Sequence, residues 1–114
     1  MAIGVDIEDI NRFENKSPEF LKRVFSPSEL DYCMKYSKPE SHLAARFCAK
    51  EAVVKALTAL GITNISYNEI EVFHNENQCP QIRTIKKLEK NIKFQVSLSH
   101  DRSKAIAFVT AEEQ

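Results

Sequence analysis

Residues 40–60 constrain the fold of this chain more than any other segment, because they read as one long helix that is apolar on most sides. At 100° per residue, large apolar side chains fill one broad arc, and a strip of alanines lies behind it. The arc holds Leu43, Phe47, Val53, Val54, Leu57 and Leu60, and the strip holds Ala45, Ala49, Ala52 and Ala56. Such a helix must be buried on most of its surface, and Gly61 is expected to end it.

After its first residue, Glu40, four charged side chains interrupt this otherwise apolar helix. Arg46 and Lys50 project within or beside the apolar arc, whereas Glu51 and Lys55 lie one turn apart on a single flank. Buried charge is unfavourable unless it is paired or liganded. Two interpretations stay open: an internal set of ion pairs, with Glu51 bonded to Lys55, or a helix that lines a binding site for a polyanion.

The other segments predict an α+β domain, because helices cluster early in the chain and strands late. Strands are expected over residues 2–7, 67–73, 81–85, 92–99 and 104–110, and short helices over residues 17–25 and 26–36. In the first strand, Ile3, Val5 and Ile7 alternate with smaller or polar residues and are expected to face the core. The long helix should therefore pack on an antiparallel sheet.

Length and composition favour one compact domain spanning residues 1–114. Lys plus Arg and Asp plus Glu both number 16, so the net charge is zero, and no bulk charge attracts nucleic acid or a membrane. The three cysteines lack the spacing of a zinc site or a disulfide framework, which favours a reducing compartment. No signal peptide or membrane-spanning run is recognised. We expect a cytoplasmic protein with no nucleic-acid or membrane partner.

Asp6 strengthens the interpretation of a polyanion site. It follows an apolar strand, and Glu8 and Asp9 come directly after it. Magnesium keeps several waters and takes only one or two protein carboxylates together with phosphate oxygens. Lysine and arginine then neutralise the remaining phosphate charge. Asp6 and Glu51, on different elements and near several cations, are therefore candidate carboxylates of a magnesium–phosphate site, although an isolated acidic residue after a strand is more often a solvated strand end.

Three motifs together resemble one enzyme family. They are Gly-Val-Asp-Ile at residues 4–7, Arg-Phe-Cys-Ala-Lys-Glu-Ala-Val-Val-Lys-Ala at residues 46–56, and Val-Ser-Leu-Ser-His at residues 96–100. Their order and spacing are similar to those of the holo-[acyl-carrier-protein] synthases, which are small single-domain 4′-phosphopantetheinyl transferases. The segment at residues 25–30 also resembles the family, so that the resemblance covers nearly the whole chain and implies the 4′-phosphopantetheinyl transferase fold.

The resemblance implies an activity and a set of catalytic residues. The reaction transfers 4′-phosphopantetheine from coenzyme A to a serine of an acyl carrier protein, giving holo-carrier protein and adenosine 3′,5′-bisphosphate, a step in fatty acid biosynthesis. Asp6 and Glu51 match magnesium ligands, Lys55 matches the lysine beside the reacting phosphate, and Glu51 or a metal-bound water takes the serine proton. The catalytic set is then Asp6, Glu51, Lys55 and His100.

The resemblance also implies binding residues and partners. Coenzyme A is expected to meet Lys38, Arg46, Lys50, Lys55 and His100. An acidic carrier protein is expected to meet the basic residues Arg12, Lys16, Lys22 and Arg23. The family is typically a trimer with sites shared between neighbouring subunits, which predicts a homotrimer here.

Two departures from the family pattern leave alternatives open. The stretch of residues 57–61 prolongs the helix where the family shows a Gly-x-Gly turn, and Gln78-Cys79-Pro80 replaces a Gly-x-Pro. The alternatives are a transferase for a specialised carrier protein and a non-catalytic homologue that binds coenzyme A or a carrier protein. Retention of the four catalytic residues favours an enzyme.

Overall fold

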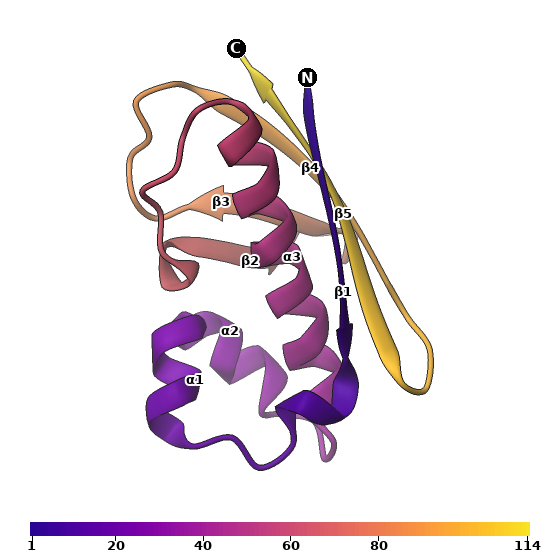
Figure 1. Cartoon of the computed structure of the whole chain (residues 1–114). Helices are drawn as coiled ribbons and strands as arrows, with labels where there is room; N and C mark the ends of the chain where they lie inside the picture. The colour runs from indigo at the N-terminus through magenta and orange to yellow at the C-terminus, as the bar shows by residue number, and fades with distance from the viewer.

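The computed structural model describes all residues of the chain, 1–114 (Figure 1). Strand β1 (Ala2–Asp9) leads through the 3-10 turn η1 (Ile10–Phe13) into helices α1 (Pro18–Val24), α2 (Pro27–Cys33) and α3 (Glu40–Ala59). A second 3-10 turn, η2 (Tyr67–Glu69), precedes strands β2 (Ile70–His74), β3 (Pro80–Thr84), β4 (Ile92–His100) and β5 (Lys104–Glu113). The predicted α+β organisation is confirmed.

The sheet that carries α3 has the strand order β1-β5-β4 and is antiparallel throughout. A separate hairpin of β2 and β3 crosses α3 with β3 beside β4, and α1 and α2 gather near the beginning of that helix (Figure 1). The three-stranded sheet and the hairpin thus enclose the long helix, which accounts for its apolar character on most sides. None of the helices combines the length and apolarity that crossing a bilayer requires.

Helix boundaries follow the local signals in the sequence. At α2, the Ser26 side chain accepts from the Glu29 backbone, and the Glu29 carboxylate accepts from the Ser26 backbone, which completes the predicted capping box. Just after the C-terminal end of α3, Gly61 adopts a positive φ of 83°, the left-handed conformation that ends a helix. Residues 67–69 form the turn η2 instead of the first part of a strand.

The alanine strip of α3 packs directly against β1 and β5. Ala49, Ala52 and Ala56 are fully buried, and they face the equally buried Ala105 and Ala107 of β5. The approach is closest at Gly4, where an added Cβ atom would lie 1.9 Å from the Ala52 carbonyl oxygen. Gly4 is therefore required by the distance between strand and helix.

We expect the substitution Gly4→Ala to destabilise the protein, because the added methyl group meets rigid backbone. Overpacking of a core typically costs about 1–3 kcal/mol, and a contact this short places the change at the upper end or beyond. Urea unfolding measures the effect, with Thr58→Val on the exposed side of α3 as the control. An unfolding midpoint equal to that of the control would show that β1 moves away from α3 without penalty.

The predicted orientation of the first strand is wrong. Ile3, Val5 and Ile7 are 60%, 50% and 59% exposed, while Ala2 and Gly4 occupy the buried face. Side chains alternate along a strand, and only the face with small residues permits the close approach to the alanines of α3. The apolar side chains consequently point outward, beside the half-exposed Ile106 and Phe108 of β5.

Candidate active site

Asp6 lies on the helix-facing side of β1, with its side chain only 10% exposed. Its Oδ1 atom lies 3.5 Å from the Nζ atom of Lys55, and its Oδ2 atom is buried without any hydrogen-bond partner. Burial raises the pKa of Asp6 to about 6, and the neighbouring carboxylates of Glu8 and Glu51 add to this rise, while Lys55 opposes it. The ionised form of Asp6 is thus buried with too little positive charge nearby to balance it.

Glu51 and Lys55 project from α3 toward the part of β1 that carries Asp6. The Tyr67 hydroxyl donates a hydrogen bond to Glu51 Oε1, and this bond, together with burial, raises the pKa of Tyr67 to about 12. The Lys55 ammonium is half-exposed and donates to the Val5 carbonyl at 2.9 Å. Lys55 therefore bonds to β1 and Asp6, and the structure contains no ion pair between Glu51 and Lys55. The interpretation based on that pair is wrong.

Glu8 and Arg12 join this cluster, although the sequence did not single out Glu8 for a role. Glu8 lies on the same face of β1 as Asp6, is 14% exposed, and bonds through Oε1 to Arg12 Nη1 at 2.5 Å. The Arg12 guanidinium also lies over the ring of Phe47, 5.0 Å from its centroid. The two-residue spacing of Asp6 and Glu8 is the signal that places both carboxylates on one strand face.

The residues present fit a magnesium ion. Asp6 contributes an unpartnered oxygen, and Glu51 contributes a carboxylate with one oxygen, Oε2, free of hydrogen bonds. No three histidine, cysteine or acidic side chains form a preassembled metal cage, and Mg²⁺ does not require one when phosphate oxygens and water complete its shell. A divalent cation would also offset the carboxylate repulsion at Asp6.

Lys50 occupies a different environment from the one expected. Its side chain is fully buried, its Nζ atom lies 2.8 Å from Glu29 Oε1, and the same atom donates to the carbonyls of Tyr67 and Ile70. Burial lowers the pKa of Lys50, and the adjacent Glu29 carboxylate opposes that change. The structure therefore does not bring Lys50 to the surface of the site, and its ammonium is occupied by protein groups.

Arg46 belongs to a second cluster on the other side of α3. It is 3% exposed, lies 4.2 Å from the centroid of the Tyr32 ring, and donates to the His42 carbonyl at 3.2 Å, while its Nε atom lacks a partner. It also approaches His74, 3.5 Å from Nδ1. Burial and the Arg46 charge lower the pKa of both His42 and His74. A cavity of about 310 Å³ opens beside these side chains.

The remaining predicted residues are exposed except Lys16, which is half-buried with its Nζ atom 5.2 Å from the centroid of the Phe20 ring. His100 ends β4, in register with Ala105, which is itself opposite Glu8, so that His100 lies two strands from the carboxylate cluster. Lys38 is exposed in the loop before α3, and Lys22 and Arg23 are exposed on the last turn of α1. One subunit thus brings together Asp6, Glu51 and Lys55 and leaves Arg46, Lys38 and His100 apart from them.

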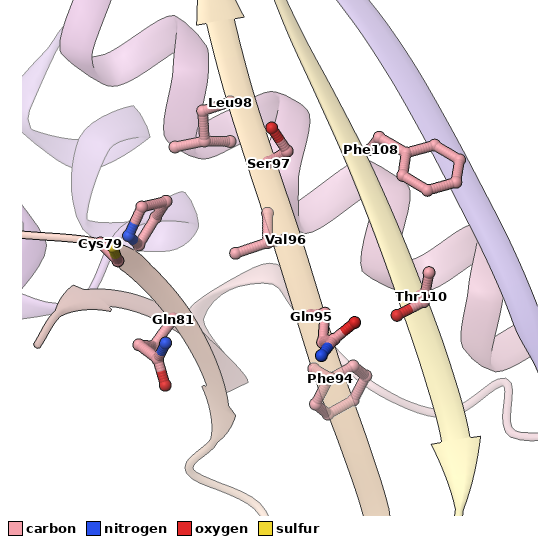
Figure 2. Close-up of a pocket in the computed structure, with 10 residues that line it drawn as sticks. Cys79, Gln81, Phe94, Gln95, Val96, Ser97, Leu98, Phe108 and Thr110 are labelled. Atoms are coloured by element: carbon pink, nitrogen blue, oxygen red, sulfur yellow. The ribbon is translucent and has the colours of Figure 1, made fainter.

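A third feature is a cavity of about 600 Å³ between β3 and β4, which none of the predicted site residues lines. Figure 2 shows Gln81 of β3 on one side of it and the β4 side chains on the other. The Phe108 and Thr110 side chains of β5 continue the lining onto the outer face of the sheet. None of the carboxylates Asp6, Glu8 and Glu51 lines this cavity.

The chain has an α+β fold with a carboxylate cluster between a strand and a long helix. Comparison with known proteins shows to which protein family it belongs. The sequence pattern of the 4′-phosphopantetheinyl transferase superfamily matches residues 2–109. The chain belongs to this family.

Named relatives narrow the comparison. The chain is 45% identical over 121 residues to the holo-[acyl-carrier-protein] synthase of Cytophaga hutchinsonii, covering 95% of this chain and 94% of the relative. It is 36% identical over 121 residues to that of Clostridium tetani, covering 98% and 95%. Among solved structures, the Helicobacter pylori holo-[acyl-carrier-protein] synthase in complex with coenzyme A superimposes with a TM-score of 0.79 at 34% identity, covering 96% of this chain and 99% of that one.

Proposed function

We propose that this protein transfers 4′-phosphopantetheine from coenzyme A to a serine of an acyl carrier protein, releasing adenosine 3′,5′-bisphosphate. The observation that carries the proposal is the buried Asp6 carboxylate, which has an unpartnered oxygen beside Glu51 and Lys55. Such a carboxylate needs a cation, and a magnesium-bound diphosphate supplies one. The names of the relatives and the coenzyme A complex of a solved relative support the same reaction.

The reaction requires the serine oxygen to attack the phosphorus that carries the pantetheine arm. The bond from that phosphorus to the oxygen of the nucleotide phosphate then breaks, so that negative charge accumulates on adenosine 3′,5′-bisphosphate. Asp6 and Glu51 would hold magnesium, which supplies charge neutralisation of the diphosphate when bound. Lys55 is half-exposed beside Asp6 and would stabilise the departing phosphate. Glu51 or a metal-bound water would accept the serine proton.

The rest of coenzyme A would be bound across a subunit boundary. Arg46 precedes Glu51 by five residues and so lies about 140° away around α3, at 100° per residue. The two side chains therefore point to different sides of the helix, and a single phosphate group cannot contact both. Arg46, Lys38 and His100 of one subunit would therefore serve the carboxylates of the next, with the cavity beside Arg46 and Tyr32 receiving a phosphate. A direct role of Lys50 stays a prediction, because its burial requires the Glu29 contact to open first.

The homotrimer that this arrangement needs has a suitable surface. Ile3, Val5 and Ile7 of β1 lie beside Ile106 and Phe108 of β5, and all five are exposed in the isolated chain. Contiguous apolar surface of this kind is typical of an interface. It continues into the cavity of Figure 2 through Phe108. A second copy of the chain is the proposed occupant, because one subunit leaves Arg46, Lys38 and His100 apart from the carboxylates that they would serve.

We expect Phe108→Lys to break the oligomer and to abolish transfer with it, because a lysine cannot be buried unpaired at an apolar contact. Light scattering after size-exclusion chromatography measures the mass, and transfer is assayed on the same fractions. Glu76→Lys, a charge change on the exposed turn between β2 and β3, is the control. A trimer that persists in Phe108→Lys would contradict this interface.

The basic side of α1 is expected to attract the carrier protein. Lys22 and Arg23 are exposed, whereas Arg12 is bonded to Glu8, so that the α1 pair gives the cleaner test. Reversing both to glutamate should raise the KM for carrier protein several-fold without changing that for coenzyme A, and the wild-type KM for carrier protein should increase with salt. Equal changes in both KM values would show that these charges do not steer the carrier protein. Lys16 belongs to the same predicted carrier-binding set.

Mass spectrometry of apo-carrier protein incubated with this protein, coenzyme A and Mg²⁺ tests the proposed function directly. Addition of the phosphopantetheine mass shows an enzyme, whereas coenzyme A binding without addition shows a non-catalytic homologue. Use of a fatty-acid carrier and a specialised carrier in parallel assigns the partner. A cytoplasmic location and a role in fatty acid biosynthesis belong to the proposal and depend on which carrier is modified.

A further inference from the structure

We propose that Tyr67 is a positioning residue for Glu51: its hydroxyl holds Glu51 Oε1 so that Oε2 is presented to the metal ion. This inference rests on the proposed function for its catalytic meaning, but the hydrogen bond is independent of it. Nothing else in the chain donates a hydrogen bond to Glu51 among the side-chain contacts of the structure. Without Tyr67, no other side chain would fix the rotamer of this half-buried carboxylate.

The hydroxyl is held in place from three directions. The backbone carbonyl of Tyr67 accepts a hydrogen bond from the buried Lys50 ammonium at 2.9 Å. The ring packs on Phe47 of α3, with centroids 5.3 Å apart at 56°. The turn η2 is closed by reciprocal bonds between Ser66 and Glu69. A phenol that is fixed in this way can orient a carboxylate, because its own rotamer is already determined.

The buried Lys50–Glu29 pair thereby gains a connection to the site. Glu29 accepts from the Val72 backbone at 2.8 Å, and Lys50 donates to the carbonyls at both ends of η2, at Tyr67 and Ile70. The pair fixes the start of β2 relative to α3, which carries Glu51. Lys50 therefore acts on the site through the position of Tyr67.

Tyrosine is chemically suited to this role. A neutral hydroxyl satisfies one oxygen of Glu51 without adding a second positive charge that would compete with a cation for the carboxylate. A lysine at this position would neutralise Glu51 and weaken its attraction for magnesium. The phenol also leaves the other carboxylate oxygen, Oε2, free for a metal ion. Partners of metal-binding side chains typically change metal affinity or activity by about 10–100-fold when they are removed.

The test is Tyr67→Phe, which retains the ring that packs on Phe47 and removes only the hydroxyl. Binding of Mn²⁺, used as a paramagnetic probe in place of Mg²⁺, is measured by electron paramagnetic resonance with coenzyme A present. We expect affinity to fall about 10-fold or more, with a similar rise in the Mg²⁺ concentration that gives half-maximal transfer. The KM for carrier protein and the melting temperature should stay close to those of the control Thr58→Val.

A double-mutant cycle shows whether the effect passes through Glu51. In Glu51→Gln, the substitution Tyr67→Phe should have no further effect on Mn²⁺ affinity. Unchanged Mn²⁺ affinity in Tyr67→Phe overturns the proposal, as does an equal loss in the presence and absence of the Glu51 carboxylate. Reduced Mn²⁺ affinity in a protein that never modifies any carrier would support the positioning role while rejecting the proposed transferase function.

Should Tyr67→Phe prove unstable, Glu69→Ala perturbs the same hydroxyl by removing the carboxylate that accepts from the Ser66 backbone at 2.8 Å, which loosens η2 and leaves the phenol in the chain. This variant should show a smaller loss of Mn²⁺ affinity in the same assay. Wild-type affinity in a Glu69→Ala protein whose turn is shown by hydrogen exchange to have loosened would also overturn the proposal.

Discussion

Replacing Asp6 with asparagine should abolish transfer and at the same time raise the melting temperature above that of the wild type at pH 8. The loss is expected because the charge of Asp6 is needed at the metal site, and removal of one such electrostatic group typically reduces kcat by about 10²–10³-fold. The gain in stability follows from the burial of Asp6 beside Glu8 and Glu51, which makes its ionised form unfavourable. Function and stability should therefore change in opposite directions at this residue.

The raised pKa of Asp6 determines how the stability of the wild-type protein changes with pH. The folded protein raises the pKa of Asp6 from 3.8 to about 6, so the stability associated with the protonated acid is present below pH 3.8 and is lost as pH rises through about 6. At about 1.4 kcal/mol per pKa unit, the loss at pH 8 amounts to roughly 3 kcal/mol. The asparagine side chain of the Asp6→Asn variant does not ionise and avoids this loss.

Melting curves of both proteins between pH 4 and pH 8, recorded in EDTA, measure the difference. The stability advantage of Asp6→Asn should disappear as pH falls toward 4. Glu51→Gln, measured in parallel, should also abolish transfer. A wild-type protein that is more stable than Asp6→Asn at pH 8 in EDTA would contradict the strained carboxylate, and near-normal transfer by either variant would contradict the metal site.

The sequence predicted those parts of the site that local spacing determines. Glu51 and Lys55 lie one turn apart, and a helix of known start places both on one flank. The C-terminal end of α3 was predicted from Gly61, because a glycine that ends a helix acts on the turn beside it. The residues alone made Asp6 a candidate partner of Glu51, but only the family resemblance placed it beside both side chains, because the contact of β1 with α3 joins segments that are distant in the chain.

The errors arose where tertiary packing overrides a local pattern. Apolar alternation in β1 predicted that Ile3, Val5 and Ile7 face the core, but α3 presents alanines and admits only Gly4 and Ala2 at that distance. Helical periodicity separated Lys50, within or beside the apolar arc, from Lys55 on the flank, but it did not identify what Lys50 contacts. Its partner, Glu29, lies on another helix. No periodicity in the sequence reports such a partner.

Lys50 and Lys55 therefore provide a matched pair for the second large effect. Lys50 is fully buried against Glu29, and removing one partner of a buried pair typically destabilises a protein by about 3–5 kcal/mol. Lys50→Met should show that loss in urea unfolding, with transfer falling only as folded protein is lost or the Tyr67 turn loosens. A normal unfolding midpoint combined with weak coenzyme A binding would instead favour the direct phosphate contact predicted from the sequence.

Lys55→Met should have the converse phenotype, with a melting temperature close to wild type and a kcat lowered by about 10²-fold or more. The ammonium is half-exposed, so its ion pair with Asp6 contributes little to stability. Its charge would instead act on the departing phosphate, which becomes more negative in the transition state than in bound coenzyme A. Methionine keeps much of the apolar stem and removes only the cation. Measuring kcat by carrier mass shift and coenzyme A affinity by calorimetry on one preparation separates the two roles: if affinity collapses while kcat at saturation is unchanged, Lys55 binds the ground state and does not assist phosphate departure.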